Sequence, residues 1–287
     1  MDHVRKKVGM EKTIKHGITG KDVVVAVLDT GICDHVDFGD RVVFFKDFVN
    51  GNTCRYDDNG HGSHVCGIIG GDGTASNGRY GGMAPKCKLV VLKVLDQGGN
   101  GDTRTVLEAL DWVKKNRYLY DIRLLNFSVG FLPGAKLSEQ EALVTAFEEL
   151  WELGITVVTA SGNKGPKAGS ISVPGISRVL LTVGAMDEYG AKYSGKGPTG
   201  CCIVKPEVLA PGSNIVSCDT DREGYVKKSG TSMAAPVVTG ALALGMEYHE
   251  RLLPKEWKLR MYHRLTRDER YPGCWGILHV DNLLGLN

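Results

Sequence analysis

Residues 23–31 read Val-Val-Val-Ala-Val-Leu-Asp-Thr-Gly, and this stretch decides the fold class that the sequence predicts. Its first six residues form a continuous apolar run rich in valine, which is typical of a strand buried on both faces of a sheet. The run ends at Asp29, and Thr30 and Gly31 then indicate a turn. Strands of this kind belong to parallel sheets covered by helices, so we expect an α/β protein.

Further predicted strands and helices alternate along the chain. Four more apolar runs predict strands at Leu89–Leu95, Leu124–Val129, Ile155–Ala160 and Val179–Ala185. Two helical patterns lie between them: Thr103–Asn116 after the capping residue Asp102, and Ser138–Leu153, which opens with a capping box of Ser138 and Glu141. This alternation predicts one large domain with a mostly parallel, doubly wound sheet and helices on both faces.

Polar residues stand at or just after the ends of three of these strands. They are Asp29, Ser128 and Asn163. Because the carboxyl ends of parallel strands meet at one edge of a sheet, and sites in such folds form there, we expect these residues to share one rim.

A serine stands at a glycine-hinged bend near the other end of the chain. Residues 230–236 read Gly-Thr-Ser-Met-Ala-Ala-Pro and open a segment that is apolar nearly all round, which predicts a helix running through the interior. Ser232 is therefore a candidate nucleophile, and the alternative is an ordinary helix N-cap. Pro236 departs from plain helix design because its missing N–H frees a carbonyl in the first turn.

His61 lies in a glycine-rich stretch at residues 58–64 that leads into an apolar helix. His61 and His64 have the spacing of two metal ligands on one helical face, but no third ligand follows at a recognisable spacing, and we expect His61 to precede the helix. The other interpretation is that His61 is a general base for Ser232, which requires an acid to orient the imidazole.

Asp29 is the candidate acid, although a carboxylate after a strand is also an ordinary turn residue. The tripeptide Asp-Thr-Gly raises the further alternative of an aspartic protease, which needs two carboxylates sharing a proton. The chain contains no second Asp-Thr-Gly or Asp-Ser-Gly. That alternative therefore ranks below nucleophilic catalysis by a serine.

Five stretches resemble signatures of the subtilisin family in that family's order, and they span nearly the whole chain from about Val23 to Gly240. They read VAVLDTGI, DDNGHGSHVCGIIGG, NFSVG, TASGN and SGTSMAAP. The order of Asp29, His61 and Ser232 is also that of the subtilisin triad. The resemblance implies a three-layer subtilisin-like fold and a serine endopeptidase that works through an Asp-His-Ser triad and an acyl-enzyme.

The resemblance also assigns expected roles to individual residues. Asp29 matches the orienting acid, His61 the general base, Ser232 the nucleophile and Asn163 the oxyanion donor. The substrate-binding positions fall into two segments. Ser128, Val129 and Gly130 match the edge that pairs with extended substrate, while Ala160, Ser161 and Gly162 match the wall of the pocket for the residue before the scissile bond. The expected partners are thus protein or peptide substrates, and the competing class is a catalytically silent peptide-binding relative.

Composition bounds the partners and the compartment. Lys and Arg number 35 against 33 Asp and Glu, so a net charge of +2 indicates no nucleic-acid partner. No segment approaches the roughly 20 apolar residues that cross a bilayer, so no membrane partner is expected. The absence of a secretory signal in the given chain predicts a cytoplasmic protein, or a secreted one if a leader was removed. The eight cysteines form no CxxC motif, which favours reduced thiols.

We expect residues 1–20 to form a basic N-terminal leader, most simply a solvated tail, and residues 21–287 to form the peptidase domain. Subtilisin-like enzymes usually carry a prodomain, for which the residues before the first strand are too few, so the resemblance points to prodomain-poor intracellular bacterial members. We expect no required cofactor and no catalytic metal. Oxygen donors at residues 72–82 and 96–102 leave structural calcium open.

Overall fold

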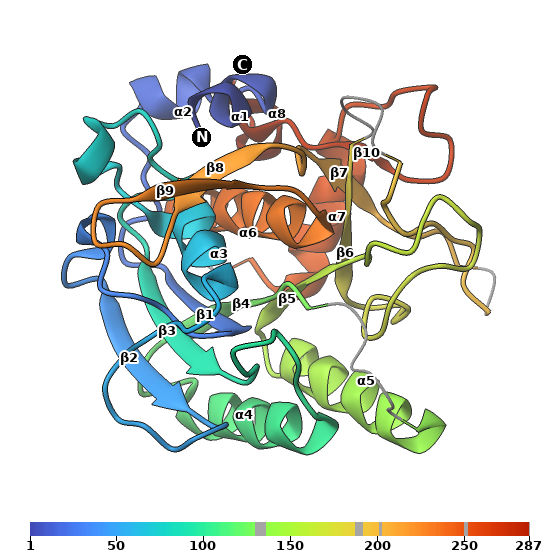
Figure 1. The fold of residues 1–287 in the computed structure, drawn as a ribbon. Coiled ribbons are helices and arrows are strands. Elements are labelled where there is room, and N and C mark those ends of the chain that lie inside the picture. The colour runs from blue at the N-terminus through green and yellow to red at the C-terminus, as the bar shows by residue number, and fades with distance from the viewer. Residues whose placement is uncertain (130–135, 187–191, 201–202, 250–251, 287) are drawn as a thin grey trace.

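A computed structural model describes residues 1–129, 136–186, 192–200, 203–249 and 252–286 (Figure 1). Its centre is an eight-stranded sheet in the order β10-β7-β6-β5-β4-β1-β3-β2, in which the neighbouring described strands are all parallel. The strands are β1 (Val24–Asp29), β2 (Val42–Asp47), β3 (Lys88–Lys93), β4 (Ile122–Phe127), β5 (Thr156–Ala160), β6 (Leu181–Ala185), β7 (Val208–Ala210) and β10 (Gly276–Ile277). The predicted mostly parallel sheet is confirmed.

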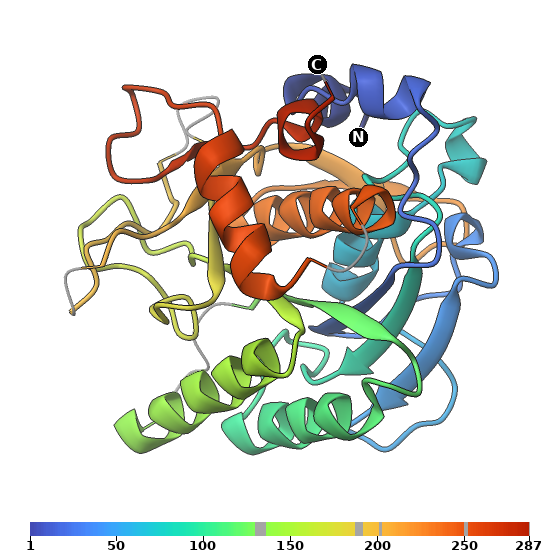
Figure 2. The same ribbon diagram turned by 180° about the vertical axis from the view of Figure 1, so that it is seen from behind.

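Helices cover both faces of this sheet. On one face α3 (His61–Gly70) packs against α6 (Thr231–Tyr248), with α3 on β1 and β3 and α6 on β4 to β7. On the other face α4 (Thr103–Asn116) packs against α5 (Leu137–Glu152). Figures 1 and 2 show α3 and α6 above the strands and α4 and α5 below them. This confirms the expected three-layer α/β fold.

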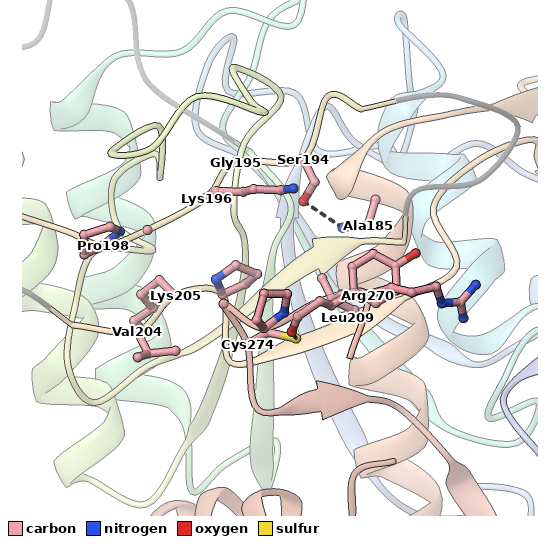
Figure 3. Close-up of a pocket in the computed structure, with 15 residues that line it drawn as sticks. Ala185, Ser194, Gly195, Lys196, Pro198, Val204, Lys205, Leu209, Arg270 and Cys274 are labelled. Atoms are coloured by element: carbon pink, nitrogen blue, oxygen red, sulfur yellow. Dashed lines mark hydrogen bonds between the residues drawn. The ribbon is translucent and has the colours of Figure 1, made fainter. Parts of the chain in front are cut away.

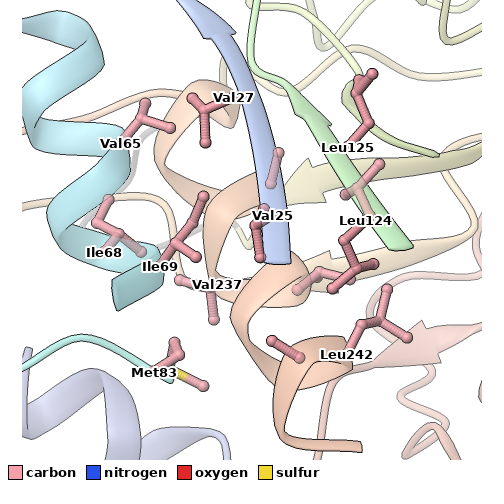
Figure 4. Packing of buried hydrophobic residues seen from close by; sticks show 14 of the residues in the cluster. Val25, Val27, Val65, Ile68, Ile69, Met83, Leu124, Leu125, Val237 and Leu242 are labelled. Atoms are coloured by element: carbon pink, nitrogen blue, oxygen red, sulfur yellow. The ribbon is translucent and has the colours of Figure 1, made fainter. Parts of the chain in front are cut away.

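The core forms where α3 and α6 meet the sheet. Val25 of β1, Leu124 of β4 and aliphatic side chains of both helices gather there (Figure 4). Gly240 of α6 allows close packing with the loop before β3, since an added Cβ would lie 2.4 Å from the Cβ of Met83. A helix that is apolar on every side is thus buried on every side, as its composition predicts.

The predicted strands and helices are largely confirmed, with differences at their ends. The five predicted strands correspond to β1, β3, β4, β5 and β6, and the helix predicted at Thr103–Asn116 has those bounds. The predicted capping box of Ser138 and Glu141 is wrong, because α5 begins at Leu137 and the Glu139 carboxylate accepts the Lys136 N–H at 2.9 Å. A short antiparallel hairpin of β8 (Ile215–Cys218) and β9 (Tyr225–Lys228) was not predicted.

The N-terminal segment is folded, so its interpretation as a solvated tail is wrong. It forms α1 (Asp2–Lys7) and α2 (Glu11–Lys15), and Met1, Val4 and Val8 are buried. The Asp281 carboxylate of α8 (Val280–Leu284) accepts the Lys12 and Thr13 N–H groups at 2.9 and 2.8 Å. Most charged side chains of this segment are exposed, whereas several of its apolar side chains are buried in the core. The basic composition of the segment did not indicate this burial.

The remaining described elements are two 3-10 turns, at Val36–Phe38 and Thr74–Ser76, and the helix α7 (Pro254–Arg264) near the C-terminus. No helix within the described residues has the length and apolar character needed to cross a membrane.

Candidate active site

Asp29 is the last residue of β1 and is fully buried. One of its carboxylate oxygens, Oδ1, accepts the Thr30 N–H at 2.8 Å and lies 2.7 Å from Nδ1 of His61. The other oxygen, Oδ2, is buried and has no hydrogen-bond partner among the described residues. The strand therefore holds a buried carboxylate whose strongest partner is an imidazole, a pairing that fixes the ring orientation and the tautomer.

His61 is the first residue of α3, because Gly60 provides the N-cap in a left-handed conformation (φ 83°). The expectation that His61 precedes the helix is wrong by that one position. Its side chain is 25% exposed, whereas Asp29 is not exposed at all, so one edge of the ring reaches solvent. Burial acts to lower the pKa of His61, but the charge and hydrogen bond of Asp29 outweigh it, so the pKa lies above 6.5.

His64 faces away from His61 and has a different environment. Its Nε2 lies 3.1 Å from the carbonyl oxygens of both Ile215 and Val226, so it joins α3 to the β8–β9 hairpin. Burial, followed by the nearby Lys228 charge, lowers the pKa of His64 to about 3, which keeps the ring neutral. The two histidines therefore have separate partners, and the metal-pair alternative gains no support from their geometry.

Ser232 is the second residue of α6 and is partly exposed. Gly230, not Ser232, occupies the N-cap position, with backbone angles of φ 153° and ψ 164° that residues other than glycine rarely adopt. The N-cap alternative for Ser232 is therefore wrong. The helix begins close to α3, since the two helices pack together and the Lys228 ammonium donates to the Gly60 carbonyl at 2.9 Å. A side chain three residues before α6 thus reaches the residue that directly precedes His61.

Asn163 follows β5 and is bonded to the residue before the serine. Its Oδ1 accepts the backbone N–H and the hydroxyl of Thr231, each at 3.0 Å. Because the amide oxygen is engaged twice, the amide NH₂ group is the part of Asn163 that remains available to a ligand. Sequence reasoning had not identified Thr231, although it directly precedes Ser232 in the chain.

The two expected substrate-binding segments extend from β4 and β5. Ser128 directly follows β4, and its buried hydroxyl accepts from Nδ2 of Asn126 at 2.7 Å. Val129 is partly exposed, and Gly130 lies outside the described residues. Because β1, β4 and β5 are neighbours in the sheet and parallel, the expected grouping of Asp29, Ser128 and Asn163 along one rim is confirmed.

The second segment, at the end of β5, is held by backbone hydrogen bonds to neighbouring loops. Ala160 is the last residue of β5, and the carbonyl of Ser161 accepts the Ser172 N–H at 2.9 Å. Gly162 has a left-handed conformation (φ 88°), and its carbonyl accepts the Gly195 N–H at 2.8 Å. These bonds leave Ala160, Ser161 and Gly162 with little freedom to move.

A cavity of about 350 Å³ borders the loop that holds Ser161 and Gly162, because its lining includes Ser194 and Gly195 (Figure 3). Its lining comes from the loop after β6, β7 and the C-terminal loop, and it includes Ala185, Ser194, Val204, Leu209, Arg270 and Cys274. None of Asp29, His61, Asn163 and Ser232 lines it. Figure 3 shows the hydrogen bond by which Ser194 accepts the Ala185 N–H.

Two carboxylates in the loops that the sequence leaves open for calcium accept hydrogen bonds within their own turns. In the loops left open for calcium, Asp72 accepts the Thr74 N–H and Asp96 accepts the Gly98 N–H, each at 2.8 Å. Both carboxylates therefore shape their own turns, as short acidic side chains commonly do.

One buried cluster, His35, Asp37 and Cys218, places three metal-ligating atoms within 4.8 Å of one another. The His35 ring bonds the Gly224 carbonyl through Nε2 at 2.9 Å and accepts the Asp37 N–H through Nδ1 at 3.1 Å. The Tyr225 hydroxyl donates to Asp37 at 2.7 Å. The cluster is a satisfied hydrogen-bond network, as buried polar groups usually are, and we assign no metal to it.

Comparison with known proteins agrees with this geometry. The subtilase family, Peptidase_S8, matches residues 20–285. Serine protease AprX of Bacillus subtilis (strain 168) is 38% identical over 279 residues, covering 86% of this chain and 62% of the relative. Subtilisin Savinase of Lederbergia lenta is 37% identical, covering 79% of this chain and 77% of that protein.

Solved structures show the same likeness. A cold adapted subtilisin-like serine proteinase superposes with a TM-score of 0.74 at 30% identity, over 91% of this chain and 88% of the other. The CspB protease of Clostridium perfringens shares the fold with a TM-score of 0.86 at 17% identity. This chain spans less than two thirds of the AprX protease and 60% of the thermostable alkaline protease of Halalkalibacterium halodurans. The match over nearly all of its own residues nevertheless shows that the chain belongs to the subtilase family.

Proposed function

We propose that the chain is a serine endopeptidase in which Ser232 is the nucleophile, His61 the general base and Asp29 the orienting acid. The observation that carries this proposal is the 2.7 Å contact between Nδ1 of the partly exposed His61 and the fully buried Asp29. Ser232 stands at the start of α6, next to the Thr231 residue that is bonded to Asn163. Membership of the subtilase family supports it, because that family is named for such peptidases.

The chemistry then follows the Ser-His-Asp template. Nε2 of His61 takes the proton of the Ser232 hydroxyl while the oxygen attacks the peptide carbonyl carbon. Asp29 stabilises the imidazolium that forms, and its hydrogen bond keeps Nε2 free for this exchange. His61 next gives the proton to the leaving amine, which departs from an acyl-enzyme. Water repeats the sequence with His61 again as base, releasing the carboxylic acid and restoring Ser232.

The developing negative charge on the carbonyl oxygen needs donors. We assign this role to the amide NH₂ of Asn163 together with the backbone N–H of Ser232. Thr231 holds the amide oxygen at 3.0 Å, so the NH₂ group needs no reorientation when charge develops. Preorganised donors of this kind account for about 10²–10³ in turnover, a size established on the equivalent asparagine of subtilisin, a member of the same family.

The proposed substrates are extended stretches of protein or peptide. Residues 128–130 pair with the substrate backbone, and residues 160–162 form one wall of the pocket for the residue before the cleaved bond. Backbone pairing is insensitive to most side chains, so cleavage tolerates many sequences. We assign the peptidase domain to residues 21–287, with residues 1–20 packed on it, and propose that it acts without a required cofactor. The free thiols among the described cysteines support a reducing, cytoplasmic compartment.

The proposal is tested by incubating the protein with an unstructured polypeptide and identifying the products by mass spectrometry. New N-termini at many internal positions are expected from the wild type, and none from Ser232→Ala. Ser229→Ala is the matched control, since Ser229 is an exposed serine three residues earlier whose hydroxyl accepts the Asn214 N–H at 2.8 Å. Equal products from Ser232→Ala and the wild type would refute the assignment.

A further inference from the structure

Asp57, four residues before His61, accepts five hydrogen bonds although it is only 8% exposed. Its Oδ1 accepts the Asn59 and Gly60 N–H groups at 3.1 and 2.8 Å and the Thr30 hydroxyl at 2.8 Å. Its Oδ2 accepts both the N–H and the hydroxyl of Ser63, at 2.8 and 2.7 Å. Both oxygens are therefore fully used, and their donors come from different parts of the fold.

These donors belong to the two segments that carry Asp29 and His61. Thr30 directly follows Asp29, and its N–H donates to the Asp29 carboxylate at 2.8 Å. The Thr30 hydroxyl donates to Asp57 and accepts the Gly62 N–H at 2.8 Å, so it links the end of β1 to the first turn of α3. A continuous chain of hydrogen bonds thus runs from the Asp29 carboxylate through Thr30 and Asp57 to the residues on either side of His61.

An ordinary capping carboxylate of this protein makes fewer connections. Asp102 caps α4 by accepting the N–H and the hydroxyl of Thr105, at 2.9 and 2.8 Å, and both donors belong to the helix that it caps. Asp57 caps α3 in the same manner through Ser63 but in addition bonds Thr30, twenty-seven residues earlier in the chain. The extra bond is what joins the strand to the helix.

We propose that Asp57 is a positioning residue of the active site, which holds Asp29 and His61 in register through Thr30 and the first turn of α3 and places a second buried carboxylate in the loop that enters this helix. This inference rests on the proposed peptidase function only for its kinetic consequence. The effect of Asp57 on the His61 ring can be measured without any catalysis.

The charged groups around His61 define the expected direction. Asp29 lies at 2.7 Å on β1, Asp57 lies in the loop that enters α3, and Lys228 approaches from β9 through the Gly60 carbonyl. The other titratable groups on α3, His64 and Cys66, are neutral near pH 7, because burial lowers the pKa of His64 and raises that of Cys66. Apart from burial, which lowers the pKa of His61, both carboxylates raise it and Lys228 lowers it. Removing the charge of Asp57 should therefore lower the pKa of His61.

The first experiment is an NMR titration of the His61 ring in the Ser232→Ala protein, which cannot digest itself by the proposed mechanism. Asp57→Asn, which keeps the side-chain shape, should lower the pKa of His61 and shift the resonance of the Nδ1 proton shared with Asp29. The control is Asp47→Asn, because Asp47 is likewise buried and accepts four hydrogen bonds, from Val49, Asn50, Asn52 and the Tyr56 hydroxyl. A His61 titration that is the same in both variants would overturn the proposal.

The second experiment uses Thr30 and does not depend on Asp57→Asn folding. Thr30→Val removes the hydroxyl without changing the shape, and Thr30→Ser restores it. In otherwise wild-type protein, Thr30→Val should lower kcat by about tenfold or more with little change in KM, since small misplacements of catalytic groups cost up to about 10² in rate. Thr30→Ser should recover most of that loss. Equal kcat values for the two variants would contradict the proposed link through Thr30.

The two arms separate the two claims. If the wild type neither cleaves peptides nor reacts at Ser232, the peptidase function fails, while the NMR titration still decides whether Asp57 sets the state of His61. If the wild type is active and His61 titrates identically with and without the Asp57 charge, the peptidase function stands and the positioning role is wrong.

Discussion

The side-chain oxygen of Asn163 accepts hydrogen bonds from both the backbone N–H and the hydroxyl of Thr231, each at 3.0 Å. Asn163 follows β5 and Thr231 begins α6, so the two bonds connect the rim of the sheet to the helix that carries Ser232. They also decide which end of the amide faces the substrate, because an oxygen with two donors leaves the NH₂ group free. An oxyanion donor thus acquires its orientation from the residue next to the nucleophile.

Replacing Thr231 with valine should therefore weaken catalysis without weakening substrate binding. The valine keeps the backbone N–H but loses the hydroxyl, so Asn163 retains one of its two anchors. We expect kcat to fall by several-fold to tenfold with KM unchanged, whereas Asn163→Ala should lose about 10²–10³ in kcat. Thr231→Ser is the control and should remain near wild type. Steady-state kinetics on a peptide substrate make the comparison, and a larger loss in Thr231→Ser than in Thr231→Val would contradict it.

The pH dependence of turnover should report His61. The fold raises the pKa of His61 above 6.5, so the imidazolium persists to a higher pH than in a free histidine. Only the neutral ring can accept the Ser232 proton, and kcat/KM should rise with pH through a value above 6.5. In the Ser232→Ala protein, NMR should find the His61 pKa on the same side of 6.5, and Asp29→Asn should lower it. A His61 pKa below 6.5 in the protein that retains Asp29 would contradict the assigned pairing of His61 with Asp29.

His64 should make the fold less stable in acid. Its folded pKa is about 3 against an ordinary 6.5, so the unfolded chain binds a proton that the folded protein rejects. The free energy of unfolding should therefore fall by about 1.4 kcal/mol for each pH unit below 6.5, from this residue alone. The raised pKa of His61 acts in the opposite direction.

The two contributions are separated by urea denaturation of Ser232→Ala with and without His64→Gln. Glutamine does not titrate but keeps an N–H donor for the Ile215 and Val226 carbonyls. The variant should show a smaller loss of stability between pH 6.5 and 4.5. Equal slopes in the two proteins would show that His64 titrates normally.

Gly62 should not tolerate alanine. A Cβ at this position would lie 2.2 Å from the Gly31 carbonyl oxygen, which is backbone and cannot swing away. Gly62→Ala should force the first turn of α3 away from the end of β1 and lower stability by about 1–3 kcal/mol. Gly273→Ala is the control, because a Cβ there meets nothing within 4 Å and the change should stay within about 0.5 kcal/mol. Urea denaturation in the Ser232→Ala background measures both, and equal stabilities would refute the close approach.

The sequence predicted the long buried elements well because each carries its own signal. The valine run of β1, the cap and amphipathic face of α4 and the apolar length of α6 are local patterns that the tertiary structure does not contradict. The rim position of Asp29 and Asn163 followed from the rule that parallel strands end at one edge. The candidate site could therefore be assembled from local patterns together with a family resemblance.

The remaining features depend on contacts that no local pattern records. The edge strand β2 is half exposed, and β7 and β10 span only Val208–Ala210 and Gly276–Ile277, too short for a periodicity. The packing of the first twenty residues depends on Asp281 at the far end of the chain. Asp57 and Thr231 looked like ordinary loop and helix-start residues until their partners in other elements were known.

The reactivity of a single hydroxyl tests the central claim most directly. A fluorophosphonate reacts with a serine that a neighbouring base has activated, and the adduct can be located by mass spectrometry of the digested protein. The account predicts one adduct on Ser232 of the folded wild type, none in Ser232→Ala, and strongly slowed labelling in His61→Ala. A folded wild type that acquires no adduct on Ser232, or that is labelled as fast without His61 as with it, would contradict the account.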